Sequence, residues 1–151
     1  TFIPLAQSSL VPTSDFTPAP LADGKYYWRV RAINELSVKG SWSTVSLLKV
    51  DATPPEVPLL YKPLDGVIKL KVPVFSWYAA GGANTYVFEY RVKDSDTDWV
   101  ATVPMTLLYY KPPITESIVL EWRVRALDTA LNQSVSEVRT ITINLLTAAS
   151  P

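Results

Sequence analysis

Three aspartates alternate with small polar residues in Asp94-Ser95-Asp96-Thr97-Asp98, and a run of this kind could bind a cation. Calcium prefers oxygen ligands, and the alternation would place the three carboxylates on one side of a hairpin. An EF-hand loop would need Gly and Glu where this sequence has Trp99 and Met105. Two interpretations stay open: Asp94, Asp96 and Asp98 form a calcium site, or they form a solvated hairpin that discourages edge pairing.

Composition excludes most other chemistry. The 151 residues contain no Cys and no His, which removes thiolate nucleophiles, imidazole bases, disulfides and the usual zinc ligands. The formal net charge is zero, so the whole chain has no field that would steer nucleic acid or an anionic membrane. We therefore expect no enzyme, no catalytic residue, no cofactor other than calcium, no nucleic-acid partner and no membrane span.

Six aromatic residues suggest a second kind of binding. Aromatic side chains on a flat face of a β-sandwich can hold sugar rings, although a sandwich core and its edge strands also need such residues. The candidates are Tyr27, Tyr61, Tyr78, Trp99, Tyr109 and Tyr110. Glycan is therefore a possible partner.

Arginines supply further candidates. Arg29 and Arg31 alternate on one strand, so both could stack on Trp42 of the next strand, a contact more typical of structure than of ligand binding. In the later copy of this strand, Arg123 or Arg125 could pair with Glu89, and such exposed pairs contribute little to stability.

One sequon is present. Asn132-Gln133-Ser134 would lie exposed in a loop between strands and would accept glycan if the source organism glycosylates.

The elements that position these residues are repeated. Trp28-Arg29-Val30-Arg31-Ala32 returns as residues 122–126, a shift of 94 residues, which is the size of one small β-sandwich module. With one residue dropped in the following loop, Ser43 aligns with Ser136 and Val50 with Ile143. We expect the repeated unit to be a domain rather than a solenoid turn.

Thirteen Pro and five Gly separate segments of alternating hydrophobicity, which predicts short strands joined by turns. The expected strands cover residues 57–61, 69–77, 86–92, 99–103, 106–110, 120–126 and 135–143. Tyr86, Phe88, Tyr90 and Val92 are expected to face inward, with Glu89 and Arg91 outward. Leu120, Trp122, Val124 and Ala126 are likewise expected to face the core.

The chain resembles the fibronectin type III family, in the form found in large secreted and cell-surface proteins of bacteria and archaea. The resemblance rests on Phe75-Ser76-Trp77, Tyr86, the segment from Tyr26 to Ala32, Ser41-Trp42-Ser43 and Pro54-Pro55. It implies seven-strand sandwiches in tandem, without catalytic residues, that serve spacing, adhesion or protein contact. It also implies that the Tyr26 hydroxyl ties down the preceding loop, a bond that Leu120 cannot make in the second copy.

The expected fold is therefore all-β, with tandem immunoglobulin-like sandwiches of which the first is incomplete on its N-terminal side. Residues 1–51 would be the C-terminal half of one module, 52–58 a Pro-rich linker, 54–145 a complete module and 146–151 a tail. Strands missing from the first module would precede Thr1 in a longer chain, or would come from another copy of the protein.

The expected function is a structural or adhesive scaffold segment of an extracellular or cell-surface protein, with other modules or copies of itself as partners. Two alternatives remain: a subunit of an extracellular filament with strand complementation between chains, and an accessory module, in contact with glycan, of a secreted polysaccharide-degrading enzyme.

Overall fold

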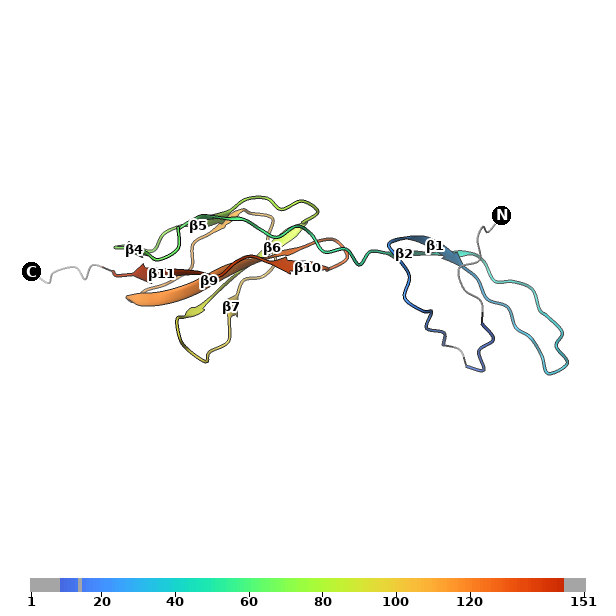
Figure 1. The fold of residues 1–151 in the computed structure, drawn as a ribbon. Helices are drawn as coiled ribbons and strands as arrows, with labels where there is room; N and C mark the ends of the chain where they lie inside the picture. Colours follow the sequence, from blue (N-terminus) through green and yellow to red (C-terminus); the bar gives the residue numbers. More distant parts are fainter. Residues whose placement is uncertain (1–8, 14, 146–151) are drawn as a thin grey trace, which may run out of the picture. The chain divides into compact units, whose positions relative to one another are not determined.

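The computed structural model describes residues 9–13 and 15–145, which contain eleven β-strands and no helix (Figure 1). The expected all-β fold is confirmed. The chain divides into two compact units, Thr1–Thr53 and Pro54–Pro151. The predicted tail, residues 146–151, lies outside the described residues.

The first unit is built on one hairpin. Strands β1 (Gly24–Trp28) and β2 (Ser46–Val50) pair antiparallel, and the ladder continues beyond them through the contact of Ile33 with Lys39. The hydroxyl of Tyr26 donates a 2.8 Å hydrogen bond to the carbonyl of Ala22, which confirms the expected corner. We refer to residues 24–50 below as the first hairpin.

The second unit has two sheets. The short strands β3 (Leu60–Lys62), β5 (Phe75–Trp77) and β8 (Tyr109–Tyr110) form the small sheet. The large sheet has the order β4-β11-β9-β6-β7, with β10 added beside β9. Its strands are β4 (Val67–Lys69), β6 (Thr85–Val92), β7 (Val100–Ala101), β9 (Ile118–Leu127), β10 (Gln133–Val135) and β11 (Arg139–Ile143).

The core lies between these two sheets. Phe75 of the small sheet meets Trp122 and Phe88 of the large sheet, with ring centroids 5.0 Å apart in each pair. Because side chains alternate along β9, one face of the strand points into the core. On this face the side chains of Leu120, Trp122, Val124 and Ala126 are at most 1% exposed. The inward assignment of these four residues is confirmed.

Two expected strands are divided. Residues 69–77 do not form one strand: β4 pairs in parallel with β11, while β5 pairs with β3 in the other sheet. Pro73 lies between them and has no N–H to donate to a ladder. Residues 135–143 are split at Ser136, whose side-chain oxygen, in place of a backbone carbonyl, accepts the N–H of Val124 at 3.0 Å.

The structure corrects the expected position of one residue and the expected exposure of another. Val92 is exposed rather than buried, because the core does not extend to this last residue of β6. Glu89 points away from the core as expected but is only 3% exposed, because arginines from the neighbouring strand cover it.

Residues 55–58 are packed against the second unit. Pro55 and Pro58 are buried, and the N–H of Glu56 donates to the carbonyl of Gly81 at 2.8 Å. The hydroxyl of Ser134 in turn donates to the Glu56 carbonyl at 2.8 Å. This part of the proposed linker is therefore held by its own unit.

Candidate functional site

The outer face of the large sheet carries a network of charges. Register places Glu89 of β6 opposite Arg123 of β9, and Val87 opposite Arg125, so both arginines can reach the one carboxylate. Arg123 Nε donates to one Glu89 oxygen and Arg125 Nη2 to the other, both at 2.6 Å. The sequence predicted one of these pairs, and the structure contains both.

A tryptophan covers part of this network. The guanidinium carbons of Arg91 and Arg123 lie over the ring of Trp99, 4.7 and 4.1 Å from its centroid. Arg91 Nε also donates to Glu121 at 2.7 Å. Trp99 is thereby committed to packing on arginine, and the charged groups around it are paired with one another rather than turned toward a ligand.

The first hairpin has the stack that the sequence predicted. The guanidinium carbons of Arg29 and Arg31 lie over the Trp42 ring, 4.2 and 4.3 Å from its centroid. Contacts of this kind contribute about 0.5–1 kcal/mol at exposed sites. The second copy has Val135 at the corresponding position, so its arginines use Trp99 and Glu89 instead.

The three aspartates are exposed in the loop between β6 and β7. Asp94 takes a positive φ of 56° and lies 3.6 Å from Lys93 Nζ, while Ser95 and Thr97 hydrogen-bond to each other. Within the described ranges, no three His, Cys, Asp or Glu side chains are grouped so that they could hold a metal ion. Calcium binding at Asp94, Asp96 and Asp98 stays a prediction without geometric support.

Of the six candidate aromatic residues, three share the outer face of the small sheet. The rings of Tyr61 and Tyr78 have centroids 5.2 Å apart. Tyr109 pairs with Ser76, which places it diagonally next to Tyr78. All three side chains are about half exposed. We call Tyr61, Tyr78 and Tyr109 the tyrosine platform.

The other aromatic candidates do not join this platform. Tyr110 faces inward and packs against the core, and Trp99 lies under two arginines. Tyr27 is exposed on the first hairpin. Trp99, Tyr109 and Tyr110, three of the six candidates, therefore lie on different faces.

The sequon is less accessible than expected. Asn132 is half-buried, and its side-chain amide donates to the Asp128 carboxylate at 2.9 Å. The other Asp128 oxygen accepts the backbone N–H groups of Ala130 and Asn132, at 2.8 and 2.9 Å. Asn132 is thus part of the structure of a tight turn. Its glycosylation stays a prediction.

This turn is repeated in the first hairpin, and sequence analysis missed it. One side-chain oxygen of Asn34 accepts the N–H groups of Leu36 and Val38 at 3.0 and 2.9 Å. The third residue after each capping residue has a positive φ, 61° at Ser37 and 69° at Leu131. The signal was present, because Asn34 and Asp128 are separated by the same 94 residues as the two pentapeptides.

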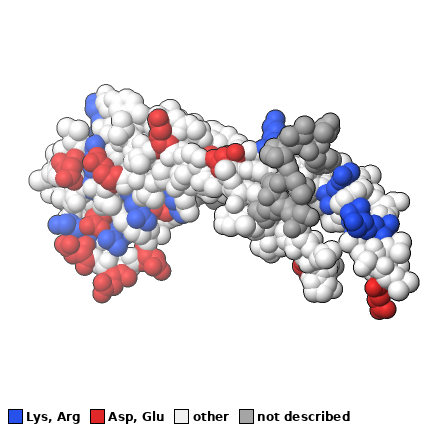
Figure 2. Space-filling model, turned by 45° about the vertical axis from the view of Figure 1, so that its right-hand side comes forward, with Lys and Arg blue, Asp and Glu red and all other residues white. Residues whose placement is uncertain are grey.

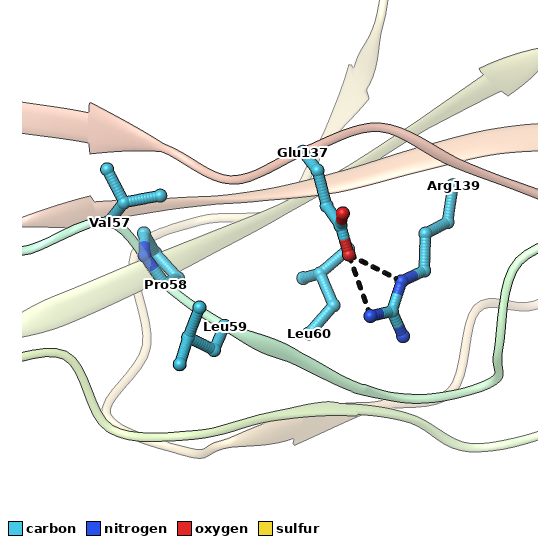
Figure 3. A pocket seen from close by; sticks show the side chains of 6 residues that line it. All are labelled: Val57, Pro58, Leu59, Leu60, Glu137 and Arg139. Carbon is cyan, nitrogen blue, oxygen red and sulfur yellow. Dashed lines mark hydrogen bonds and ion pairs between the residues drawn. The ribbon is translucent and has the colours of Figure 1, made fainter.

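A cavity beside β3 is small. It has a volume of about 190 Å³ and is lined by Val57, Pro58, Leu59, Leu60, Glu137 and Arg139. Figure 3 shows the ion pair between Glu137 and Arg139 on one side of it, with a distance of 2.7 Å. Ligand sites are typically about 300–1,000 Å³, so this hollow is too small for a drug-sized molecule.

One carboxyl group has a perturbed acidity. The Thr53 hydroxyl and, to a lesser extent, the Ala52 N–H donate to Asp23 and lower the pKa of its carboxyl group. These bonds fasten the end of the first unit to the residue before β1. The role of these bonds is structural. Asp23 lies on the surface, and neither of these two hydrogen-bond partners is ionisable.

Comparisons with known proteins give a fold and no family. No protein-family description matches the sequence, and neither does any curated protein. The structure is similar to the solution structure of the fibronectin type III domain of human fibronectin type III domain containing protein 3. The TM-score is 0.50 at 17% identity, and the match covers 67% of this chain and 96% of that domain.

A crystal structure of the FN1–FN3 domains of chicken CNTN1 also matches, with a TM-score of 0.45 and 17% identity. That match covers 80% of this chain and 43% of the longer one. The similarity to the single human domain supports the fibronectin type III-like fold expected from the sequence. No helix in the described part of the chain is long and apolar enough to cross a membrane.

Proposed function

We propose that this chain is a non-enzymatic structural or adhesive segment of a large extracellular or cell-surface protein built from tandem β-sandwich modules. The observation that carries the proposal is how the charged groups are used. Glu89, Arg123 and Arg125 pair with one another on the sheet face instead of lining a cleft. A sandwich whose charged groups pair with one another on its surface is suited to contacting other proteins through that surface and to separating the neighbouring modules.

Protease treatment of intact native cells tests this setting. We expect peptides of this chain to be released from whole cells and identified by mass spectrometry, while a cytoplasmic marker protein stays intact. Release of these peptides only after lysis would contradict the extracellular proposal.

A second candidate, strand complementation, is favoured by the first hairpin. Residues 1–51 would be the C-terminal half of a module, and Trp28, Val30 and Leu48 would be part of its core. These side chains are 40–58% exposed, whereas those at the corresponding positions of the second unit are fully buried. The covering strands would come from a longer chain or from another copy, and the second case would produce a filament.

Electron microscopy and mass measurement of the native material separate these cases. Filaments whose subunits exchange strands would support complementation. A longer continuous chain in peptide mapping, with particles of monomer mass, would rule it out.

The tyrosine platform supports the third candidate, an accessory module that contacts glycan in a secreted polysaccharide-degrading enzyme. Exposed aromatic rings on a flat sheet offer apolar faces to sugars. A glycan array tests it with the wild-type chain, with Tyr61→Ala/Tyr78→Ala, and with Phe16→Ala, which removes an exposed aromatic side chain of the other unit, as the control. Equal glycan binding by all three proteins would exclude the tyrosine platform as a glycan-binding site.

A further inference from the structure

The basic residues of the first unit are gathered on one hairpin. All five basic residues among positions 1–53 fall within residues 24–50, and the one acidic residue of that segment, Glu35, lies in its turn. The five are Lys25, Arg29, Arg31, Lys39 and Lys49. The zero net charge of the whole chain therefore conceals a local excess of positive charge.

Two of these residues oppose each other across the ladder. Lys25 of β1 pairs with Lys49 of β2, which places both side chains on the same face. Like charges directly opposite each other destabilise a sheet. No ion pair between described residues relieves either lysine. An unfavourable pair in an otherwise regular ladder suggests a partner that supplies negative charge.

The same face continues along the strand. Alternation from Lys25 leads to Tyr27 and then to the arginines stacked on Trp42. Tyr27 is 57% exposed between cationic neighbours. Figure 2 shows a group of Lys and Arg side chains close together on this unit, with no Asp or Glu among them. We call this surface, Lys25, Tyr27, Arg29, Arg31 and Lys49, the basic face.

The second unit shows what the same face contains where its arginines are paired with carboxylates. The register there pairs Val119 with Thr142 where the first hairpin pairs Lys25 with Lys49. It also has Glu121, held by Arg91, where the first hairpin has Tyr27. Within residues 24–50 the first hairpin thus has two cations more and one anion fewer on this face, although Asp23 and Asp51 follow at its end where the second unit has Ser117 and Asn144.

We propose that the basic face of the first hairpin binds a linear anionic polysaccharide. Carboxylate or sulfate groups along the polymer would pair with the lysines and with the edges of the guanidinium groups, and Tyr27 would contact the apolar face of a sugar ring. The choice of polysaccharide over nucleic acid rests on the extracellular function proposed above.

Binding of the full 151-residue chain to immobilised polymers tests the proposal. The probes are polygalacturonate for carboxylate, dextran sulfate for sulfate, neutral dextran, and a single-stranded oligonucleotide. We expect binding to one or both anionic polysaccharides, none to neutral dextran, and loss of binding in 1 M salt, where the screening length falls to about 3 Å.

The decisive variant is Lys25→Glu. It should weaken binding about 30-fold, because each charge near an anionic surface changes affinity by roughly five- to tenfold and this change alters two. It also creates an opposite-charge pair with Lys49, so the hairpin should become more stable and unfolding cannot explain the loss. The matched control Lys69→Glu makes the same charge change on the second unit and should leave binding within about twofold, since Lys69 is not part of the basic face.

Three results would overturn the proposal: no binding to either anionic polysaccharide, equal effects of Lys25→Glu and Lys69→Glu, or tighter binding of the oligonucleotide than of both polysaccharides. The protease experiment on intact cells tests the extracellular setting independently. A failure there, with polysaccharide binding intact, would therefore be distinguished from a failure of the basic face.

Discussion

The two copies of Trp-Arg-Val-Arg-Ala fold into hairpins with matching hydrogen bonds and opposite burial. The hydroxyl oxygen of Ser43 accepts the N–H of Val30 at 3.1 Å, and that of Ser136 accepts the N–H of Val124 at 3.0 Å. Yet Trp28 is 53% exposed and Trp122 is fully buried. Local sequence therefore specifies the hairpin, and the opposing sheet decides whether its apolar side becomes a core.

The arginines of the two copies show the same dependence on neighbours. In the second unit Arg123 and Arg125 both pair with Glu89 of β6, whereas in the first hairpin Arg29 and Arg31 lie on Trp42. One pentapeptide thus supports a network of ion pairs in one unit and a basic face in the other.

Replacing each tryptophan by alanine should give the largest contrast. Trp122→Ala removes a ring packed against Phe75 and Phe88 and should destabilise the second unit by about 3–5 kcal/mol. Trp28→Ala should cost less than about 1 kcal/mol, because the side chain is half exposed. Urea unfolding, with hydrogen exchange followed separately in β9 and in the first hairpin, measures both. Similar costs would mean that Trp28 is buried in solution by a partner.

Glu89→Gln should have the next largest effect, about 2 kcal/mol on the second unit. It leaves two guanidinium groups without a carboxylate at a buried position, although both arginines are about a third exposed and water offsets part of the loss. Glu121→Gln, which removes one partner from Arg91 only, should cost less. The comparison is made by chemical denaturation. A larger effect of Glu121→Gln would show that the pairing of Glu89 is not the dominant contact.

Removing each serine hydroxyl tests the hydrogen bonds that the two hairpins share. Ser136→Ala should cost about 1–2 kcal/mol, because Ser136 is buried and the Val124 N–H would lose its partner. Ser43→Ala should cost about 0.5 kcal/mol or less, because water can replace the hydroxyl at an exposed position. Thermal unfolding of both variants measures the difference. Equal costs would indicate that water does not reach Val30.

The smallest effect is expected at Asp23. Hydrogen bonds from Thr53 and Ala52 hold the pKa of this carboxyl group below its usual value of 3.8. Its contribution to stability is therefore fully present above that value and is lost as the pH falls through the lowered pKa. Asp23→Asn should accelerate hydrogen exchange at Ala52 at neutral pH and have no effect at strongly acidic pH. An acceleration that persists in acid would assign the effect to the changed side chain rather than to its charge.

Sequence patterns predicted those parts of the fold that depend on local alternation. Residues 86–92 and 120–126 appear within β6 and β9, and the stacking of arginines on Trp42 follows from spacing alone. The division of residues 69–77 between two sheets was not predictable, because the parallel pairing of β4 with β11 joins segments about 70 residues apart.

Burial of charged groups was equally hidden in the sequence. Alternation correctly placed Glu89 on the outer side of β6, but its coverage depends on Arg123 and Arg125 and on Trp99 from beyond the next loop. The basic face was missed for the opposite reason, since total charge averages over both units. Only the register of β1 and β2 places Lys25 opposite Lys49.

The turn that closes both hairpins has a consequence for how such a chain can diverge. In each turn the first residue, Asn34 or Asp128, holds the backbone because one of its side-chain oxygens accepts two N–H groups. The three residues that follow, Glu35-Leu36-Ser37 and Thr129-Ala130-Leu131, share no identity, yet they take the same shape. Substitutions in these exposed turns are therefore tolerated as long as the capping residue is retained. The hairpin backbone can thus carry different recognition sequences at its end.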